Sequence, residues 1–316
     1  MSLLPFCPAH ALETKPPERR WLIDTLWCEE AVGVLGGEPK CCKSFLALDM
    51  AVAVASGTDC LRHFAVPRMG RVLLYAAEDA LHVVRSRLEG VCRAAGLDLA
   101  GLDLQVITAP SLRLDLAADR ERLENTVAQL RPRLLVLDPF VRLHRCDENQ
   151  SGEVAPLLAY LRELQRTYKL AVVVVHHAKK GAAKARAGQA LRGSSEFHAW
   201  GDSNLYLRRH GENLVLSVEH RAAPSHGGIP VQLMTEGDAL ALALAQPKPV
   251  EQEPPPASVN DRIEALLRES ASPLSVTTLR RLCRLRTQTV TSALADLLGQ
   301  SRVVKSADGY SVPDSQ

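Results

Sequence analysis

The chain has 316 residues, of which 46% are hydrophobic and 23% are charged. This balance is ordinary for globular proteins and excludes a wholly disordered chain, and the length suits about two domains. The 38 Lys and Arg residues against 36 Asp and Glu residues give a formal net charge of +2, which neither favours nor excludes a nucleic-acid partner.

Membrane and secretory segments are not apparent in the sequence. No apolar run approaches the length needed to span a bilayer, and the N-terminus lacks the basic and apolar segments of a secretory signal. The eight cysteines are scattered and none forms a C-x-x-C pair, which disfavours a zinc site. We therefore expect a cytoplasmic protein with reduced thiols and no membrane partner.

A proline-rich stretch divides the chain. Residues 247–257 read PKPVEQEPPPA, and this composition favours a semi-rigid linker over a helix or a central strand. We place an N-terminal arm at residues 1–20 and a large domain at residues 21–246. A smaller domain at residues 258–316 follows the linker.

Short apolar runs alternate with helical patterns in the large domain. The predicted strands are residues 32–35, 72–76, 104–108, 134–137 and 170–175. The predicted helices are residues 43–56, 80–95, 119–130 and 153–168. Continuous apolar runs are typical of strands covered on both faces, so the pattern predicts an α/β fold with a mostly parallel sheet flanked by helices. Shorter strands that continue this sheet in antiparallel fashion are expected at residues 203–208, 213–219 and 229–234.

The loop after the first predicted strand resembles a phosphate-binding loop. Residues 36–44 read GGEPKCCKS and lead directly into a helix, which is the context of a P-loop. Loop amides and the helix N-terminus can bind the β-phosphate, Lys43 can reach the β- and γ-phosphates, and the Ser44 hydroxyl can ligate Mg²⁺. The candidate ATP-binding residues are Gly37, Glu38, Pro39, Lys40, Cys41, Cys42, Lys43, Ser44 and Phe45.

Cys42 departs from the P-loop pattern, which has glycine at this position. Glycine suits the position because the backbone passes close to the phosphates and can need a conformation that is costly for other residues. The alternative interpretations are a chance Lys-Ser pair at a helix start and a site that no longer hydrolyses nucleotide.

Two acidic strand ends support a nucleotide site. The fourth predicted strand ends in Asp138, as in a Walker B motif, and this carboxylate can hold Mg²⁺. The second predicted strand is followed by Glu78 and Asp79. If the second and fourth strands flank the P-loop strand, Glu78 lies beside the γ-phosphate and can activate the attacking water. The alternatives are an ordinary strand-end aspartate and acids that favour the start of the next helix.

The fifth predicted strand ends in His176 and His177. An imidazole at that strand end can hydrogen-bond to a γ-phosphate, whether it is neutral or charged. The alternative is a histidine pair solvated at the sheet edge. A metal site at this pair is disfavoured because no carboxylate or cysteine lies at ligand spacing.

Taken in order, these motifs resemble a known family. The motifs are the P-loop-like segment, Ala76-Ala77-Glu78-Asp79, Asp138-Pro139 with the residues 144–149, His176-His177 and residues 191–195. Together they resemble the RecA-fold ATPases of the RepA type, the hexameric replicative helicases of plasmids and other mobile elements. The resemblance covers about residues 20–245, and it implies a ring of six subunits with ATP bound between neighbours.

The resemblance also implies roles for individual residues. Lys43 and Ser44 would be phosphate and Mg²⁺ ligands, and Asp138 would be the Walker B acid. Glu78 would be the catalytic carboxylate. The remaining implied roles are those of the γ-phosphate sensor, with His176 a near-equal candidate, and of the arginine finger acting on a neighbour's nucleotide, which fall to His177 and Arg192.

A cationic segment follows the fifth predicted strand. Residues 178–193 read AKKGAAKARAGQALRG and contain five cations and no acid. In a RecA-type ring such a loop lines the channel, where cations can contact single-stranded DNA independently of sequence. The alternative is a solvated loop without a ligand. The candidate DNA contacts are Lys179, Lys180, Lys184 and Arg186.

Residues 258–316 predict a small winged helix-turn-helix domain. Helical patterns at residues 259–267, 275–283 and 287–298 precede a hairpin predicted around Asp308-Gly309. Winged helices bind duplex DNA or proteins, and eight Lys and Arg against six Asp and Glu leave this domain only weakly basic, so either partner stays open. The residues expected to face the major groove are Arg284, Arg286 and Gln288.

The sequence therefore predicts a homo-hexameric, ATP- and Mg²⁺-dependent DNA motor of the RepA-like helicase type that acts in replication of plasmid or mobile DNA. A second interpretation is a nucleotide-gated DNA-binding regulator or targeting factor with slow or absent hydrolysis. A third is an assembly protein whose nucleotide pocket is structural.

Overall fold

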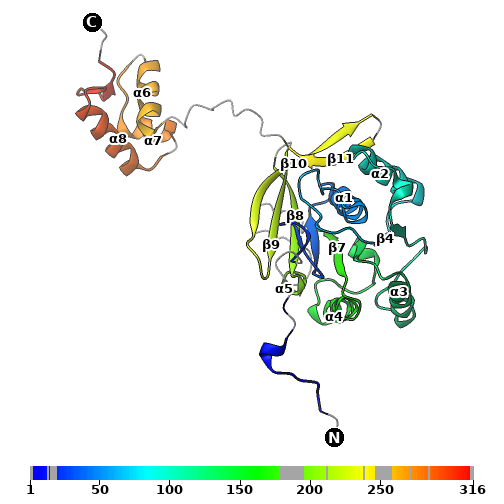
Figure 1. Cartoon of the computed structure of the whole chain (residues 1–316). Helices are drawn as coiled ribbons and strands as arrows, with labels where there is room; N and C mark the ends of the chain where they lie inside the picture. Colours follow the sequence, from blue (N-terminus) through cyan, green and yellow to red (C-terminus); the bar gives the residue numbers. More distant parts are fainter. Residues whose placement is uncertain are drawn as a thin grey trace. The chain divides into compact units, whose positions relative to one another are not determined.

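In the part of the chain that the structure describes, nine strands form one sheet in the order β11-β10-β9-β8-β3-β7-β6-β4-β5 (Figure 1). The parallel strands are β3 (Val32–Gly37), β4 (Val72–Ala76), β5 (Leu104–Val106), β6 (Leu134–Asp138), β7 (Ala171–His177) and β8 (Ser203–His210). Three further strands continue the sheet in antiparallel fashion: β9 (Asn213–His220), β10 (His226–Glu236) and β11 (Ala239–Leu244).

This computed structural model describes residues 3–12, 14, 20–177, 196–210, 213–237, 239–245, 258–270, 272–283 and 285–313. The chain divides into two units, Met1–Gln246 and Pro247–Gln316. The N-terminal residues include the short 3₁₀ helix η1 (Ala9–Ala11), whose residues are all exposed. Among the described residues, no helix is both long and apolar enough to cross a membrane.

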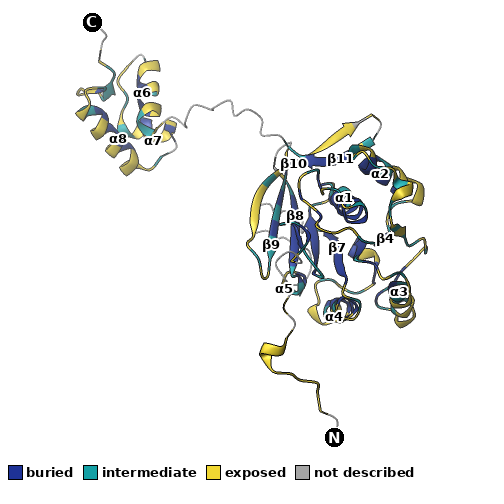
Figure 2. Cartoon of the chain, in the orientation of Figure 1, coloured by how far each residue is buried: buried dark blue, intermediate teal, exposed yellow. Residues whose placement is uncertain are grey.

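Helices cover both faces of the parallel strands. On one face, α1 (Lys43–Ser56) and α2 (Leu81–Ala94) share a core with alternate strand residues such as Val136 and Val173. On the other face, α3 (Ala117–Leu130), α4 (Ser151–Tyr168) and α5 (Glu196–Trp200) pack on the intervening strand residues. Successive side chains of a strand point to opposite faces, and Figure 2 shows the central strands buried. The double cover explains why the strands read as unbroken apolar runs.

The structure confirms the α/β fold with a mostly parallel sheet and helices on both faces. It corrects the expected strand order, because β4 and β6 do not flank the P-loop strand: the neighbours of β3 are β7 and β8. It also shows β8 to be parallel to β3, whereas we expected the antiparallel part to begin there. Three strands lie outside the predicted set: β1 (Trp21–Ile23), β2 (Trp27–Cys28) and β11.

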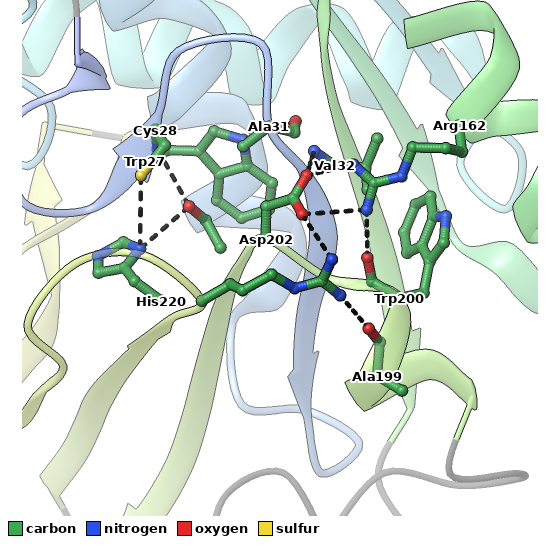
Figure 3. A network of polar contacts seen from close by, with 11 residues as sticks. Trp27, Cys28, Ala31, Val32, Arg162, Ala199, Trp200, Asp202 and His220 are labelled. Carbon is green, nitrogen blue, oxygen red and sulfur yellow. Dashed lines mark hydrogen bonds and ion pairs between the residues drawn. The ribbon is translucent and has the colours of Figure 1, made fainter. Parts of the chain in front are cut away.

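A polar network joins the start of β8 to β3 and α4 (Figure 3). The carboxylate of Asp202 accepts a hydrogen bond from the Val32 amide at 3.3 Å and pairs with the guanidinium groups of Arg162 and Arg221. Ser203 accepts a hydrogen bond from the Cys28 amide at 3.1 Å. The network therefore fixes the C-terminal end of α5 and the first residues of β8 against the amino end of β3.

The second unit contains α6 (Val259–Glu269), α7 (Val276–Cys283), α8 (Thr287–Gly299), β12 (Val304–Lys305) and β13 (Tyr310–Ser311). Its helices meet around a core that includes Ile263, Leu279 and Leu294. Lys305 pairs with Tyr310, so the hairpin loop has four residues, and the two-residue turn that we expected at this point was wrong. The elements follow the predicted order, and assignment to the winged-helix class stays a prediction.

Candidate functional site

A cleft of about 420 Å³ opens where the parallel strands β3, β4, β6 and β7 end. Parallel strands place their carboxyl ends at one edge of the sheet, and ligands of open α/β sheets bind at that edge. The cleft therefore gathers residues that lie far apart in the sequence. It is lined by Lys40, Cys41, Cys42, Lys43, Ser44, Phe45, Glu78, Asp79, Arg87, Asp138, Pro139 and His177.

Lys43 is the first residue of α1, and its side chain turns back over the loop that precedes the helix. The ammonium group donates hydrogen bonds to the carbonyl oxygens of Gly37, at 3.0 Å, and Glu38, at 2.8 Å. The residue is 6% exposed. In the described structure no side chain caps the start of α1, so the amides of its first turn and the positive end of the helix dipole suit a phosphate.

Cys42 precedes α1 with φ 64° and ψ 26°, in the left-handed region of backbone conformation. This is the conformation for which a glycine is preferred, and it costs a residue with a side chain about 1–2 kcal/mol. The P-loop pattern has glycine at this position for that backbone reason. The loop thus holds the glycine-type conformation with a cysteine in it.

Ser44 and Asp138 meet at the base of the cleft. The Ser44 hydroxyl is hydrogen-bonded to the Asp138 carboxylate, although the two residues come from different strand-end segments. Burial raises the pKa of Asp138 to about 6, while the hydrogen bond from Ser44 lowers it and the nearby charge of Asp79 raises it. Lys43 and Glu78 act in opposite directions on the same pKa. A buried carboxylate beside two other acids and a hydroxyl fits a hard divalent cation such as Mg²⁺.

Glu78 lies after β4 and reaches the cleft although β4 is not next to the P-loop strand. Ala76 pairs with Asp138 in the sheet, so the segments that follow these two strands leave it together. Arg142, in the 3₁₀ helix η4 (Phe140–Arg142), donates a hydrogen bond to Glu78 with Nε 2.9 Å from Oε1. The carboxylate is therefore oriented by the loop that follows Asp138.

Two arginines near the cleft were missed by the sequence analysis. Arg87 of α2 lines the cleft, pairs with Asp79 and lies over the Phe45 ring at 5.4 Å from its centroid. Arg209 of β8 donates a hydrogen bond to the Lys40 carbonyl at 3.3 Å. The signal for Arg209 was its place near the end of a strand that neighbours the P-loop strand, but the sequence did not reveal that adjacency.

The two histidines at the end of β7 face opposite ways. His177 pairs with Gly37 in the sheet and lines the cleft. His176 is 1% exposed and stacks on Phe197, with ring centroids 4.2 Å apart. Alternation along the strand separates the two. Of the pair, only His177 is placed to touch a nucleotide.

Several predicted site residues lie elsewhere. Arg286 and Gln288 are exposed at the start of α8 in the second unit. The remaining candidates lie outside the described residues: Lys179, Lys180, Lys184, Arg186, Arg192 and Arg284.

Comparison with known proteins identifies relatives of the first unit. A family model described as an AAA domain matches residues 2–183, which is more than half of the chain. The solved ATPase domain of a replicative helicase has a TM-score of 0.52 at 13% identity, over 69% of this chain and 86% of that one. A DnaB-like replicative helicase, solved for its interactions with primase, has a TM-score of 0.50 at 12% identity.

The second of these matches covers 67% of this chain and 57% of the helicase chain, so this chain spans little more than half of that protein. At such identities the likeness shows the fold. The expected RecA-like architecture is thereby confirmed, since helicase ATPase domains share the sheet and helix arrangement of the first unit.

Proposed function

The chain belongs to the AAA domain family, and from this membership we propose that its first unit binds and hydrolyses ATP with Mg²⁺ in the cleft. The observation that supports this most directly is the hydrogen bond between Ser44 and Asp138, beside the ammonium group of Lys43. In P-loop ATPases the loop Ser or Thr and a strand-end Asp hold the Mg²⁺ that bridges the β- and γ-phosphates.

The residues of the cleft divide the work as follows. Loop amides and the first turn of α1 bind the β-phosphate, and Lys43 exchanges carbonyl contacts for phosphate oxygens. Mg²⁺ held by Ser44 and Asp138 supplies charge neutralisation at the phosphate oxygens. Glu78 orients the attacking water and accepts its proton, and His177 donates a hydrogen bond to the γ-phosphate. The further nucleotide contacts that we propose are Gly37, Glu38, Pro39, Lys40, Cys41, Cys42 and Phe45.

We propose further that the ATPase is a motor of the RepA-like helicase type that acts on single-stranded DNA in replication of plasmid or mobile DNA. Support comes from the fold shared with helicase ATPase domains and from the five cations of residues 178–193. Sequence-independent binding of single strands uses such cations on the phosphate backbone. The proposed assembly is a homo-hexamer in which Arg192 acts on the nucleotide of a neighbouring subunit.

A second candidate function is a nucleotide-gated DNA-binding regulator with slow hydrolysis. The left-handed conformation of Cys42 favours it, because a side chain stands where the loop backbone must approach the phosphates. The two candidates differ in turnover and not in nucleotide binding.

For the second unit we propose a recruiting role, with duplex DNA or a protein as its partner. Arg286 and Gln288 are exposed at the start of α8, the helix that would enter the major groove in a winged helix. Arg284 precedes them in the sequence. Loss of duplex binding on deletion of residues 258–313 would assign DNA to this unit, and unchanged binding would assign it a protein.

ATP turnover of the full chain tests the main proposal. It is measured with and without oligo-dT, in the wild type, in Lys43→Ala and in the matched control Lys169→Asn, whose exposed lysine ends α4 at the other edge of the sheet. We expect turnover that oligo-dT stimulates and that Lys43→Ala loses. Nucleotide binding without turnover would favour the regulator, and equal turnover of Lys43→Ala and the wild type would refute the proposed site.

A further inference from the structure

One carboxylate is shared by two buried imidazoles behind the end of β7. Oε1 of Glu148 lies 3.5 Å from Nε2 of His144 and 3.8 Å from Nδ1 of His176. The side chains of both histidines are 1% exposed, and that of Glu148 is 11% exposed. A carboxylate this deeply buried needs polar neighbours, since an isolated charge in such a place is costly.

Aromatic rings enclose this cluster. His176 stacks on Phe197 of α5 at 4.2 Å and 20°, and it meets Phe140 edge-on at 6.1 Å and 88°. Phe140 also contacts His144 at 4.6 Å and Phe197 at 5.2 Å. The rings leave the imidazoles little freedom, so a movement of Glu148 is passed to His176 and from there to Phe197.

The cluster joins three segments that matter to the proposed site. His144 and Glu148 belong to the loop after η4, and that short helix also contains Arg142, the partner of Glu78. His176 directly precedes His177, which lines the cleft. Phe197 lies near the start of α5, the element that follows the cationic residues 178–193 in the sequence.

The C-terminal end of α5 is held independently. Arg221 donates a hydrogen bond to the Ala199 carbonyl, Arg162 donates one to the Trp200 carbonyl, and both guanidinium groups pair with Asp202 (Figure 3). The start of α5 is held by the stack of Phe197 on His176. The Glu148 cluster therefore controls one end of this helix while the other end is fixed.

We propose that Glu148 is a positioning residue that acts through His176. It holds the end of β7 and the start of α5 in one arrangement, and this arrangement makes turnover in the cleft responsive to single-stranded DNA. The inference rests on the proposed function, because it assigns a control element to the same site. Its physical basis is the sensitivity of phosphoryl transfer to small displacements of positioned groups.

The variant Glu148→Gln tests the proposal because it removes the charge and keeps the size of the side chain. We expect the KM for ATP to stay within about twofold, since Glu148 is not among the residues that line the cleft. The stimulation of kcat by oligo-dT should fall at least about fivefold. The matched control is Asp147→Asn: this neighbouring acid is exposed and accepts hydrogen bonds from Asn149 of its own turn. It should keep the stimulation of the wild type.

A double-mutant cycle separates positioning through His176 from a general loss of stability. His176→Phe keeps a ring against Phe197 and removes Nδ1. If Glu148 acts through His176, the double variant loses no more stimulation than Glu148→Gln alone. Losses that multiply would contradict the proposal, and so would a lower melting temperature with unchanged stimulation.

Hydrogen exchange gives a readout that needs no turnover. In Glu148→Gln the amides of residues 196–200 should exchange faster than in the wild type and in Asp147→Asn. Unchanged exchange would refute the link to α5. A wild type without ATP turnover would refute the proposed function and this inference with it. A wild type that DNA stimulates, beside a Glu148→Gln variant stimulated equally, would refute this inference alone.

Discussion

The guanidinium of Arg142 donates a hydrogen bond to the carboxylate of Glu78, and Nε and Oε1 lie 2.9 Å apart. The pair links the loop after β6 to the loop after β4, and with 61% and 42% of the side chains exposed it adds little to stability. What it does is orient Glu78. A carboxylate that must accept a proton from water is useful only when it points at that water.

If Glu78 is the proton acceptor, Glu78→Gln should lower kcat by at least about 100-fold and change nucleotide affinity by less than about threefold. Arg142→Ala should lower kcat by only about 3–10-fold, because it removes orientation and keeps the base. Steady-state turnover and binding of a fluorescent ATP analogue measure the two effects. The control is Glu121→Gln, an exposed acid of α3. A larger loss in Asp79→Asn than in Glu78→Gln would give the role to Asp79.

Burial raises the pKa of Asp138 to about 6, from an ordinary value of 3.8. The folded protein then binds this proton more tightly than the unfolded chain, so the contribution of Asp138 to stability is complete below pH 3.8 and is lost as the pH rises through 6. At pH 8, Asp138→Asn should therefore be more stable than the wild type, by about 1–3 kcal/mol in the absence of Mg²⁺. The difference should vanish near pH 4.

The same variant should abolish the stabilisation by Mg²⁺ and ATP that the wild type shows at pH 8, since the carboxylate needed for the cation is gone. In the wild type this stabilisation should weaken as the pH falls below about 6, where Asp138 becomes protonated. Thermal unfolding from pH 4 to pH 8, with and without Mg²⁺ and ATP, measures both effects. A wild type more stable than Asp138→Asn at pH 8 without ligand would contradict the raised pKa.

The local structure of the site could be predicted from the sequence because its signals are local. The helix that begins at Lys43 ends at Ser56 as expected, and β4 has the predicted bounds. The sequence also places Asp138 at a strand end, where the structure has it. Each of these depends on a short pattern: a glycine after the helix, an apolar run, or a polar residue after that run.

What the sequence could not show depends on the order of strands in the sheet. We expected β4 and β6 beside the P-loop strand, but β7 lies between β3 and β6. Glu78 reaches the cleft by the pairing of Ala76 with Asp138, and Arg209 reaches the P-loop from β8. No local pattern specifies which strands become neighbours. Arg87 was missed for a related reason, since the face that α2 turns to the cleft follows from its packing on α1.

Cys42 occupies a left-handed backbone conformation, so the residue there should matter by its shape. Cys42→Gly should leave the melting temperature within about 2 °C of the wild type, because relief of strain is offset by a more flexible unfolded chain, and turnover should be equal or higher. Cys42→Val should be less stable by about 1–2 kcal/mol, because a β-branched side chain is poorly tolerated at positive φ. Equal melting temperatures of the Gly and Val variants would show that the loop does not need this conformation.

Gly33 has no room for a side chain, because β3 and β8 come together there. A Cβ at Gly33 would lie 1.7 Å from the carbonyl oxygen of Ser203, and that backbone is fixed by the hydrogen bonds of Asp202 and Ser203 to the first unit. Gly33→Ala should therefore destabilise the protein by about 3 kcal/mol, which lowers the melting temperature by about 6–12 °C. The matched control is Gly152→Ala, in the first turn of α4, where nothing lies within 4 Å of the new methyl group. Alanine is favoured over glycine in a helix by about 0.5–1 kcal/mol, so this variant should melt at the wild-type temperature or slightly above it. Thermal unfolding of the full chain followed by circular dichroism measures both, and a Gly33→Ala variant as stable as Gly152→Ala would contradict the close approach of the two strands.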